Sequence, residues 1–191
     1  MADFDSAMAC LRDAGFGRDR PRVALILGSG WGAIEREVQD PFDIRYEDID
    51  GFPPPAGTAG HECRLTEGAL WGVPTLVFRG RYHAYEGHEA RDLAIQMRIA
   101  HALGASTVIL TNASGAIRED LQPGDLLAIR DHVNLMGLNP LAGFERVPGA
   151  KPFPAMGGAY DAELLDMLVQ AGEQAGETIH RGVYAAVLGP S

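Results

Sequence analysis

Hydrophobic residues occur along this chain in short unbroken runs separated by polar or glycine-rich turns. Residues 22–27, 73–78 and 107–111 are dominated by β-branched, aliphatic and aromatic side chains. Runs of this length without polar alternation are typical of strands that are buried on both faces of a sheet. Two more runs, at 126–130 and 182–188, have the same character. The pattern therefore predicts a central sheet of several buried strands.

Apolar residues at helical spacing separate some of these runs. The spacing predicts helices over residues 5–15, 89–103 and 161–172, the last with Asp161 as its N-cap, and a short helix near 33–38. Strands that alternate with helices through short links form βαβ units. We therefore expect an α/β fold with a mostly parallel or mixed central sheet flanked by helices.

Other segments lack a helical period. Residues 40–60 are rich in proline, glycine and aspartate, which predicts an irregular loop. Residues 62–78 predict a hairpin that turns near Gly68 or Gly72. Residues 137–160 predict a long loop of the kind that is often functional or mobile.

Length and composition limit the class of protein. A chain of 191 residues with 46% hydrophobic residues can form one sizeable core, and we expect a single domain over residues 1–191. The N-terminus shows no basic, apolar leader and no run approaches the roughly 20 residues of a membrane span, so we expect a cytoplasmic protein without a membrane partner. Cys10 and Cys63 are too few for a disulfide framework or a metal cluster.

A formal net charge of −10 argues against nucleic acid as a partner, because phosphate backbones are bound by basic patches. A small anion would need a local positive pocket that works against the field of the whole molecule. Candidate chemistry lies in three loops that follow predicted strands, at residues 28–32, 80–88 and 112–116. The carboxyl ends of parallel strands share one edge of a sheet, so these loops should converge there.

The converging loops supply groups that suit a phosphate, a sulfate or a phosphoryl group. Ser29 offers a hydroxyl, Arg81 a planar fork, His83 a ring donor and Ala113 a backbone N–H. Tyr85 adds a flat face and a hydroxyl suited to a sugar.

Other interpretations of these loops are open. The spacing Gly-Ser-Gly-Trp-Gly at residues 28–32 matches neither a dinucleotide fingerprint nor a Walker loop. The alternative interpretation is that these residues form a turn with no binding role. Residues 79–88 could form a solvated loop with an Arg–Glu ion pair. The sequence shows no metal-spaced cluster, no G-x-S-x-G elbow and no obvious carboxylate pair, so we expect no metal and no hydrolase chemistry.

Short motifs spread over nearly the whole chain give it a family resemblance. In order they lie at residues 23–32, 60–61, 80–87, 111–115, 123–125, 131–134, 153–156 and 189–191. With these motifs the chain resembles the trimeric, inosine- and guanosine-type purine nucleoside phosphorylases of the nucleoside phosphorylase superfamily. Ser114 departs from the alanine of many members.

The resemblance implies roles for particular residues. The implied phosphate-binding residues are Ser29, His61, Arg81, Tyr82, His83 and Ala113, with Arg81 and His83 as the catalytic pair. Tyr85 would contact the nucleoside, and Phe153 would reach into the site of a neighbouring subunit of a homotrimer. The implied partners are a purine nucleoside and phosphate. Phosphate is the co-substrate, and no cofactor is expected.

The resemblance also implies a reaction, the reversible phosphorolysis of inosine- or guanosine-type nucleosides to a free purine base and ribose 1-phosphate. In the family, the residues that contact the purine follow the Gly-Pro-Ser motif, which here occupies residues 189–191. We therefore expect roughly the last third of the fold to be missing, so the base preference is not determined by this sequence. The alternatives are a non-catalytic phosphate-binding fragment and a methylthioadenosine phosphorylase.

Overall fold

The computed structural model describes residues 2–54, 63–142 and 154–189 of the chain. The chain divides into two compact units, Met1–Ala113 and Ser114–Ser191, each with its own sheet. The assignment of the whole chain to a single domain, incomplete at its end, stays a prediction. Within the described residues no helix is long and apolar enough to cross a membrane.

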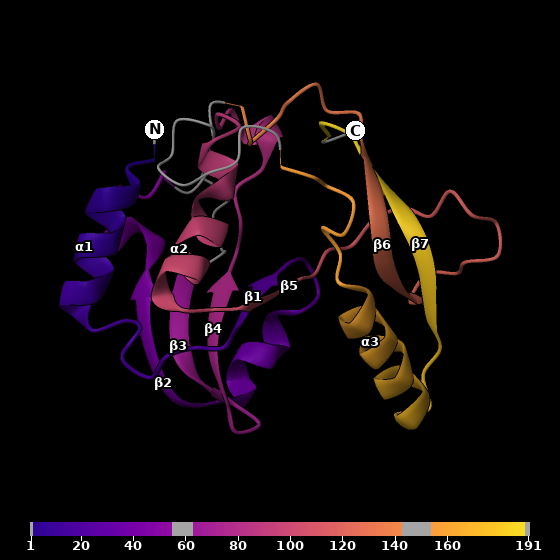
Figure 1. Cartoon of the computed structure of the whole chain (residues 1–191), viewed down its shortest axis with the longest axis horizontal. Coiled ribbons are helices and arrows are strands. Elements are labelled where there is room, and N and C mark those ends of the chain that lie inside the picture. The colour runs from indigo at the N-terminus through magenta and orange to yellow at the C-terminus, as the bar shows by residue number, and fades with distance from the viewer. Residues whose placement is uncertain (1, 55–62, 143–153, 190–191) are drawn as a thin grey trace. The chain divides into compact units, whose positions relative to one another are not determined.

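The first unit is built on a mixed sheet of five strands (Figure 1). Its strands are β1 (Val23–Leu27), β2 (Val38–Arg45), β3 (Arg64–Leu70), β4 (Val73–Arg79) and β5 (Thr107–Leu110). Its helices are α1 (Phe4–Ala14) and α2 (Ile95–Leu103), with 3₁₀ helices η1 (Gly32–Glu37), η2 (Tyr46–Asp48), η3 (Ala84–Glu86) and η4 (Asp92–Ala94). The strand order is β2-β3-β4-β1-β5, in which β1 runs parallel to β4 and β5.

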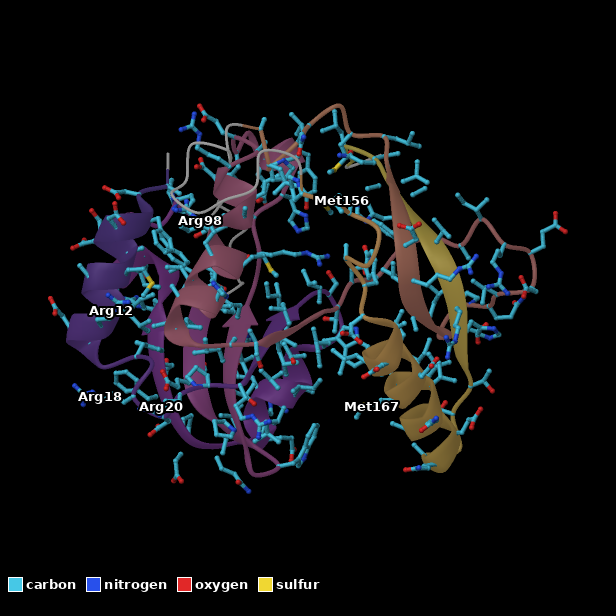
Figure 2. The ribbon with its side chains drawn as sticks, in the orientation of Figure 1. Arg12, Arg18, Arg20, Arg98, Met156 and Met167 are labelled. Atoms are coloured by element: carbon cyan, nitrogen blue, oxygen red, sulfur yellow. The ribbon has the colours of Figure 1, made fainter. Side chains whose placement is uncertain are left out.

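The main core of this unit lies where α1 and α2 pack against one face of the sheet (Figure 1). Leu11 of α1, Ile99 of α2 and Phe78 of β4 are all fully buried there. At the edge of this core the guanidinium of Arg98, labelled in Figure 2, lies 4.1 Å from the centre of the Phe4 ring. Burial of the apolar sides of both helices explains their periodicity in the sequence. The predicted α/β fold with a mixed sheet and flanking helices is confirmed.

The prediction of an irregular loop over residues 40–60 was wrong at its start, where residues 38–45 form the edge strand β2. The pairing of β2 with β3 shifts register between Gln39 and Phe42, and Asp40 has a φ of 49°. A β-bulge of this kind accommodates Pro41 because proline cannot donate to the ladder and is tolerated at edges and bulges. Asp40 and Pro41, two of the residues that suggested a loop, therefore lie at the bulge.

The hairpin of β3 and β4 turns at Trp71 and Gly72, which have φ angles of 50° and 79°. Two successive residues with positive φ are typical of the tight turns that join antiparallel strands. The alternative turn at Gly68 was wrong, because Gly68 lies inside β3. A Cβ atom there would lie 2.6 Å from the Cγ1 of Val38. The helix expected from residue 89 also begins later, at Ile95, after η4.

The second unit is a parallel pair of strands joined through a helix. β6 (Leu126–Asn134) and β7 (Ile179–Ala186) pair in parallel, and α3 (Ala162–Gln174) lies between them in the chain and packs against both. The carboxylate of Asp161 accepts a hydrogen bond of 3.0 Å from the backbone N–H of Leu164, which confirms the expected N-cap. The predicted helix and both predicted strands are confirmed with shifted ends.

A buried carboxylate ties the link between α1 and β1 to the sheet. Glu67 of β3 is 4% exposed and accepts hydrogen bonds from the backbone N–H groups of Gly17 at 2.6 Å and Asp19 at 3.3 Å. Because the substitution Glu67→Ala leaves both donors without this acceptor, we expect it to lower the free energy of unfolding by about 1–3 kcal/mol.

Urea denaturation measures this effect. The matched control is Glu89→Ala, which removes an exposed carboxylate paired with Arg91 at 3.1 Å and should change stability by less than about 1 kcal/mol. Equal stability losses in the two variants would contradict the role assigned to Glu67.

Candidate functional site

The candidate site lies at the edge of the five-stranded sheet where three parallel strands end. β4, β1 and β5 are neighbours in the sheet, so their carboxyl ends lie at the same edge. β1 leads into residues 28–32, β4 into residues 80–88 and β5 into residues 111–113. This confirms the prediction that the three loops begin side by side, which is where α/β sheets usually bind ligands.

Hydrogen bonds to Thr111 join the ends of all three strands. The backbone N–H of Gly28 donates to the Thr111 hydroxyl at 2.9 Å, and the Arg81 guanidinium donates to the Thr111 carbonyl at 2.8 Å. A Cβ atom on Gly28 would lie 2.3 Å from that carbonyl oxygen, so this approach requires glycine. No role was predicted for Thr111 from the sequence, although a threonine between a predicted strand and a candidate loop is a usable signal.

Ser29 follows Gly28 directly and is exposed to solvent. Gly30 next to it has a φ of 88°, the left-handed conformation that glycine adopts readily. The helix expected after this loop is the six-residue 3₁₀ helix η1. So short a helix has only a small macrodipole, so an anion at this loop would be attracted mainly by side chains, above all that of Arg81.

Glu35 of η1 connects the glycine-rich loop to the end of β4. Its carboxylate lies 2.7 Å from Nη1 of Arg79 and 3.9 Å from Nε of Arg64, and it accepts from the Thr66 hydroxyl at 3.4 Å. Arg64 and Arg79 are directly opposite each other in β3 and β4, an arrangement of like charges that is unfavourable by itself. Glu35 offsets this repulsion and anchors η1. No sequence motif indicated the pairing of Glu35 with Arg79.

The stretch after β4 divides its side chains between core and solvent. Tyr82 is 7% exposed and donates its hydroxyl to the Pro53 carbonyl at 2.9 Å. Its ring packs against Tyr46 and His88, and burial raises the pKa of the Tyr82 phenol far above its ordinary value. The Tyr82 side chain is thus committed to the core, so the prediction that Tyr82 binds phosphate can hold for its backbone only.

Arg81 and His83, on either side of Tyr82, are half-buried. The His83 ring stacks on Tyr85 with centroids 4.9 Å apart and an interplanar angle of 16°. The backbone N–H of His83 donates to the Glu86 carboxylate at 2.8 Å, which closes the short turn of η3. Burial lowers the pKa of His83, and the positive charge of Arg81 lowers it further. The imidazole is therefore neutral near pH 7 and can donate one hydrogen bond.

The remaining predicted site residues are either exposed or lie outside the described part of the chain. Ala113 is exposed and lies two residues after Thr111. Tyr85 is 50% exposed, which leaves part of its ring open to solvent. His61 and Phe153 lie outside the described residues. Within the part of the chain that the structure describes, no group of three or more His, Cys, Asp or Glu side chains could hold a metal ion.

Comparison with known proteins places this geometry in context. The model of the phosphorylase superfamily matches residues 22–191. Purine nucleoside phosphorylase 1 of Bacillus subtilis is 39% identical over 173 residues, which cover 91% of this chain and 64% of the relative. The purine nucleoside phosphorylase of Rattus norvegicus is 36% identical, with 91% and 62% covered. The chain thus spans less than two thirds of the length of these relatives.

The fold is also similar to solved structures of purine nucleoside phosphorylases. A Schistosoma mansoni purine nucleoside phosphorylase, complexed with a monocyclic inhibitor, has a TM-score of 0.89 and 30% identity, covering 98% of this chain and 70% of that one. A purine nucleoside phosphorylase in complex with ribose 1-phosphate has a TM-score of 0.84 and 29% identity, with the same coverage.

The depressed pKa of His83 can be measured by NMR titration of the histidine ring protons. We expect a value below the ordinary value of about 6.5 in the folded protein. The substitution Arg81→Ala should raise it part of the way, because it removes the neighbouring positive charge and leaves the burial. At pH values between the folded and the unfolded pKa of His83, the unfolded chain binds more protons than the folded protein. His83 therefore lowers the free energy of unfolding as the pH falls below about 6.5.

The variant His83→Gln identifies the resonance and should remove this part of the pH dependence. A wild-type pKa for His83 above its ordinary value would contradict the expectation.

Proposed function

The chain belongs to the phosphorylase superfamily, and from this we propose that it functions in the phosphorolysis of purine nucleosides of the inosine or guanosine type. In this reaction phosphate attacks the anomeric carbon of the nucleoside, which yields a free purine base and ribose 1-phosphate. The observation that carries the proposal is the junction of Gly28, Arg81 and Thr111, which brings three candidate loops to one edge of the sheet.

In this proposal, the phosphate-binding groups come from all three loops. Ser29 supplies a hydroxyl donor, Arg81 a guanidinium and His83 a neutral ring donor, with the backbone N–H groups of Tyr82 and Ala113. His61 completes the set by family resemblance. The bond from Arg81 to the Thr111 carbonyl orients the guanidinium at the sheet edge. A planar guanidinium forms strong charge-assisted bonds with phosphate, which provides the local attraction that a chain of net charge −10 requires.

We assign Arg81 and His83 as the catalytic pair because they hold the attacking phosphate. Cleavage of a glycosidic bond through an oxocarbenium-like transition state leaves positive charge on the sugar. A phosphate anion fixed beside the sugar stabilises that charge. Tyr85, stacked on His83 and half-exposed, is placed to contact the ribose next to the phosphate.

The remaining parts of the proposal rest on the family. Phe153 would enter the site of a neighbouring subunit, and by the family resemblance the assembly would be a homotrimer. Phosphate acts as co-substrate without a further cofactor, and the protein works in the cytoplasm. The proposed partners are small molecules, a purine nucleoside and phosphate.

The reaction is tested by incubating the intact protein with inosine and phosphate and measuring hypoxanthine and ribose 1-phosphate. We expect base release that depends on phosphate and is faster with inosine than with methylthioadenosine. A preference for methylthioadenosine would favour the methylthioadenosine phosphorylase alternative. Phosphate binding with neither nucleoside cleaved would favour the non-catalytic alternative.

The phosphate site is tested by the substitutions Arg81→Ala and His83→Ala. Each should weaken phosphate binding, measured by calorimetric titration, by about 10-fold to 100-fold, because hydrogen bonds to charged groups contribute roughly 1.5–3 kcal/mol. The affinity for nucleoside should change less. Arg91→Ala, at an exposed arginine outside the loop junction, is the matched control. Unchanged phosphate affinity in both site variants would remove Arg81 and His83 from the site.

A further inference from the structure

The carbonyl of Gly80 is held by two side chains that come from distant parts of the chain. Tyr46 of η2 donates its hydroxyl to the Gly80 oxygen at 3.0 Å, and Gln96 of α2 donates its amide to the same oxygen at 2.8 Å. The Gln96 amide also donates to the Tyr46 hydroxyl at 2.7 Å. These three groups form a closed network on one carbonyl oxygen, and both of its acceptor positions are used.

The network is buried, which makes it rigid. Tyr46 is 1% exposed and Gln96 is 2% exposed. Burial raises the pKa of Tyr46 well above its ordinary value, so its hydroxyl keeps its proton and remains a donor. A buried polar group is unfavourable unless it is hydrogen-bonded, and the two bonds donated by the Gln96 amide stabilise this side chain on the buried side of α2.

Gly80 is the residue at which the chain leaves β4 and begins the candidate phosphate loop. Its φ is 88°, and a Cβ atom there would lie 2.7 Å from the Sγ of Cys63. The Gly80 carbonyl belongs to the peptide unit that ends at the nitrogen of Arg81. The orientation of this peptide plane therefore sets the direction in which Arg81 leaves the backbone.

We propose that Gln96, together with Tyr46, is a positioning residue that fixes the Gly80 peptide and thereby orients Arg81 for phosphate. This inference rests on the proposed phosphate site. Neither side chain touches the phosphate, since both act through the Gly80 carbonyl. The guanidinium at the other end of the Arg81 side chain donates to the Thr111 carbonyl at 2.8 Å. Arg81 is thus oriented from its backbone and from its guanidinium.

The test compares phosphate binding in Gln96→Leu, Arg81→Ala and the double variant, by calorimetric titration of the full chain with inorganic phosphate. Gln96→Leu keeps the side-chain size and removes both hydrogen bonds, so phosphate affinity should fall about 5-fold to 10-fold. In the Arg81→Ala background the same substitution should change affinity by less than about 2-fold, because the group through which it acts is absent. If Gln96 had a purely structural role, Gln96→Leu would weaken phosphate binding in the Arg81→Ala background as well.

The matched control is Thr75→Val, at the opposite end of β4. Thr75 is 2% exposed and donates its hydroxyl to the Val73 carbonyl at 2.8 Å, so the variant also loses a buried hydrogen bond. It should leave phosphate affinity within about 2-fold of the wild type. Circular dichroism and urea denaturation compare the folding of all variants. If Gln96→Leu does not fold, Tyr46→Phe replaces it, since this change keeps the ring and removes one donor to Gly80.

The outcomes separate this inference from the function on which it rests. If Arg81→Ala leaves phosphate affinity unchanged, the proposed phosphate site is wrong and the inference falls with it. If Arg81→Ala weakens binding while Gln96→Leu does not, or weakens it equally in both backgrounds, the positioning role is overturned and the phosphate site stands. A loss of affinity in Thr75→Val as large as that in Gln96→Leu would also overturn it.

Discussion

The candidate site depends on the close approach of β1 and β5 where both strands end. Gly28 lies so near the Thr111 carbonyl that any side chain at this position would overlap it. This contact brings Ser29 to the end of β5, and the bond from Arg81 to Thr111 adds the loop after β4. The parallel pairing of β4, β1 and β5 brings the three loops to one edge of the sheet, and the hydrogen bonds to Thr111 hold the strand ends together there.

Around this junction, buried polar groups hold the loops in place. Gln96 and Tyr46 hold the Gly80 carbonyl, and Glu35 joins η1 to Arg79. Tyr46 and Gln96 are buried beneath the loop after β4, whereas Ser29 is exposed and Arg81 and His83 are half-buried. The loops thus have a fixed inner side and an accessible outer side, which is the arrangement that a preorganised anion site needs.

The chain belongs to the phosphorylase superfamily, which agrees with an anion site at this edge of the sheet. Relatives named purine nucleoside phosphorylase are similar over about nine tenths of the chain. In our proposal the residues described here form the phosphate part of the site, and the base-contacting part belongs to sequence that follows the Gly-Pro-Ser motif in the family. Burial and the positive charge of Arg81 lower the pKa of His83, and in our proposal a ring N–H of this imidazole donates to the phosphate.

The sequence by itself determined most of the strands, the long helices and the convergence of the loops, because apolar runs and helical spacing distinguish strands from helices. The motifs also identified Ser29, Arg81, His83 and Tyr85 as candidates. The tertiary structure decided which groups meet: Thr111 with Gly28 and Arg81, Glu35 with Arg79, and Gln96 with Gly80. It also turned Tyr82 into the core and made the Pro41 segment an edge strand with a bulge. These outcomes depend on strand register and on contacts between distant residues, which local patterns do not encode.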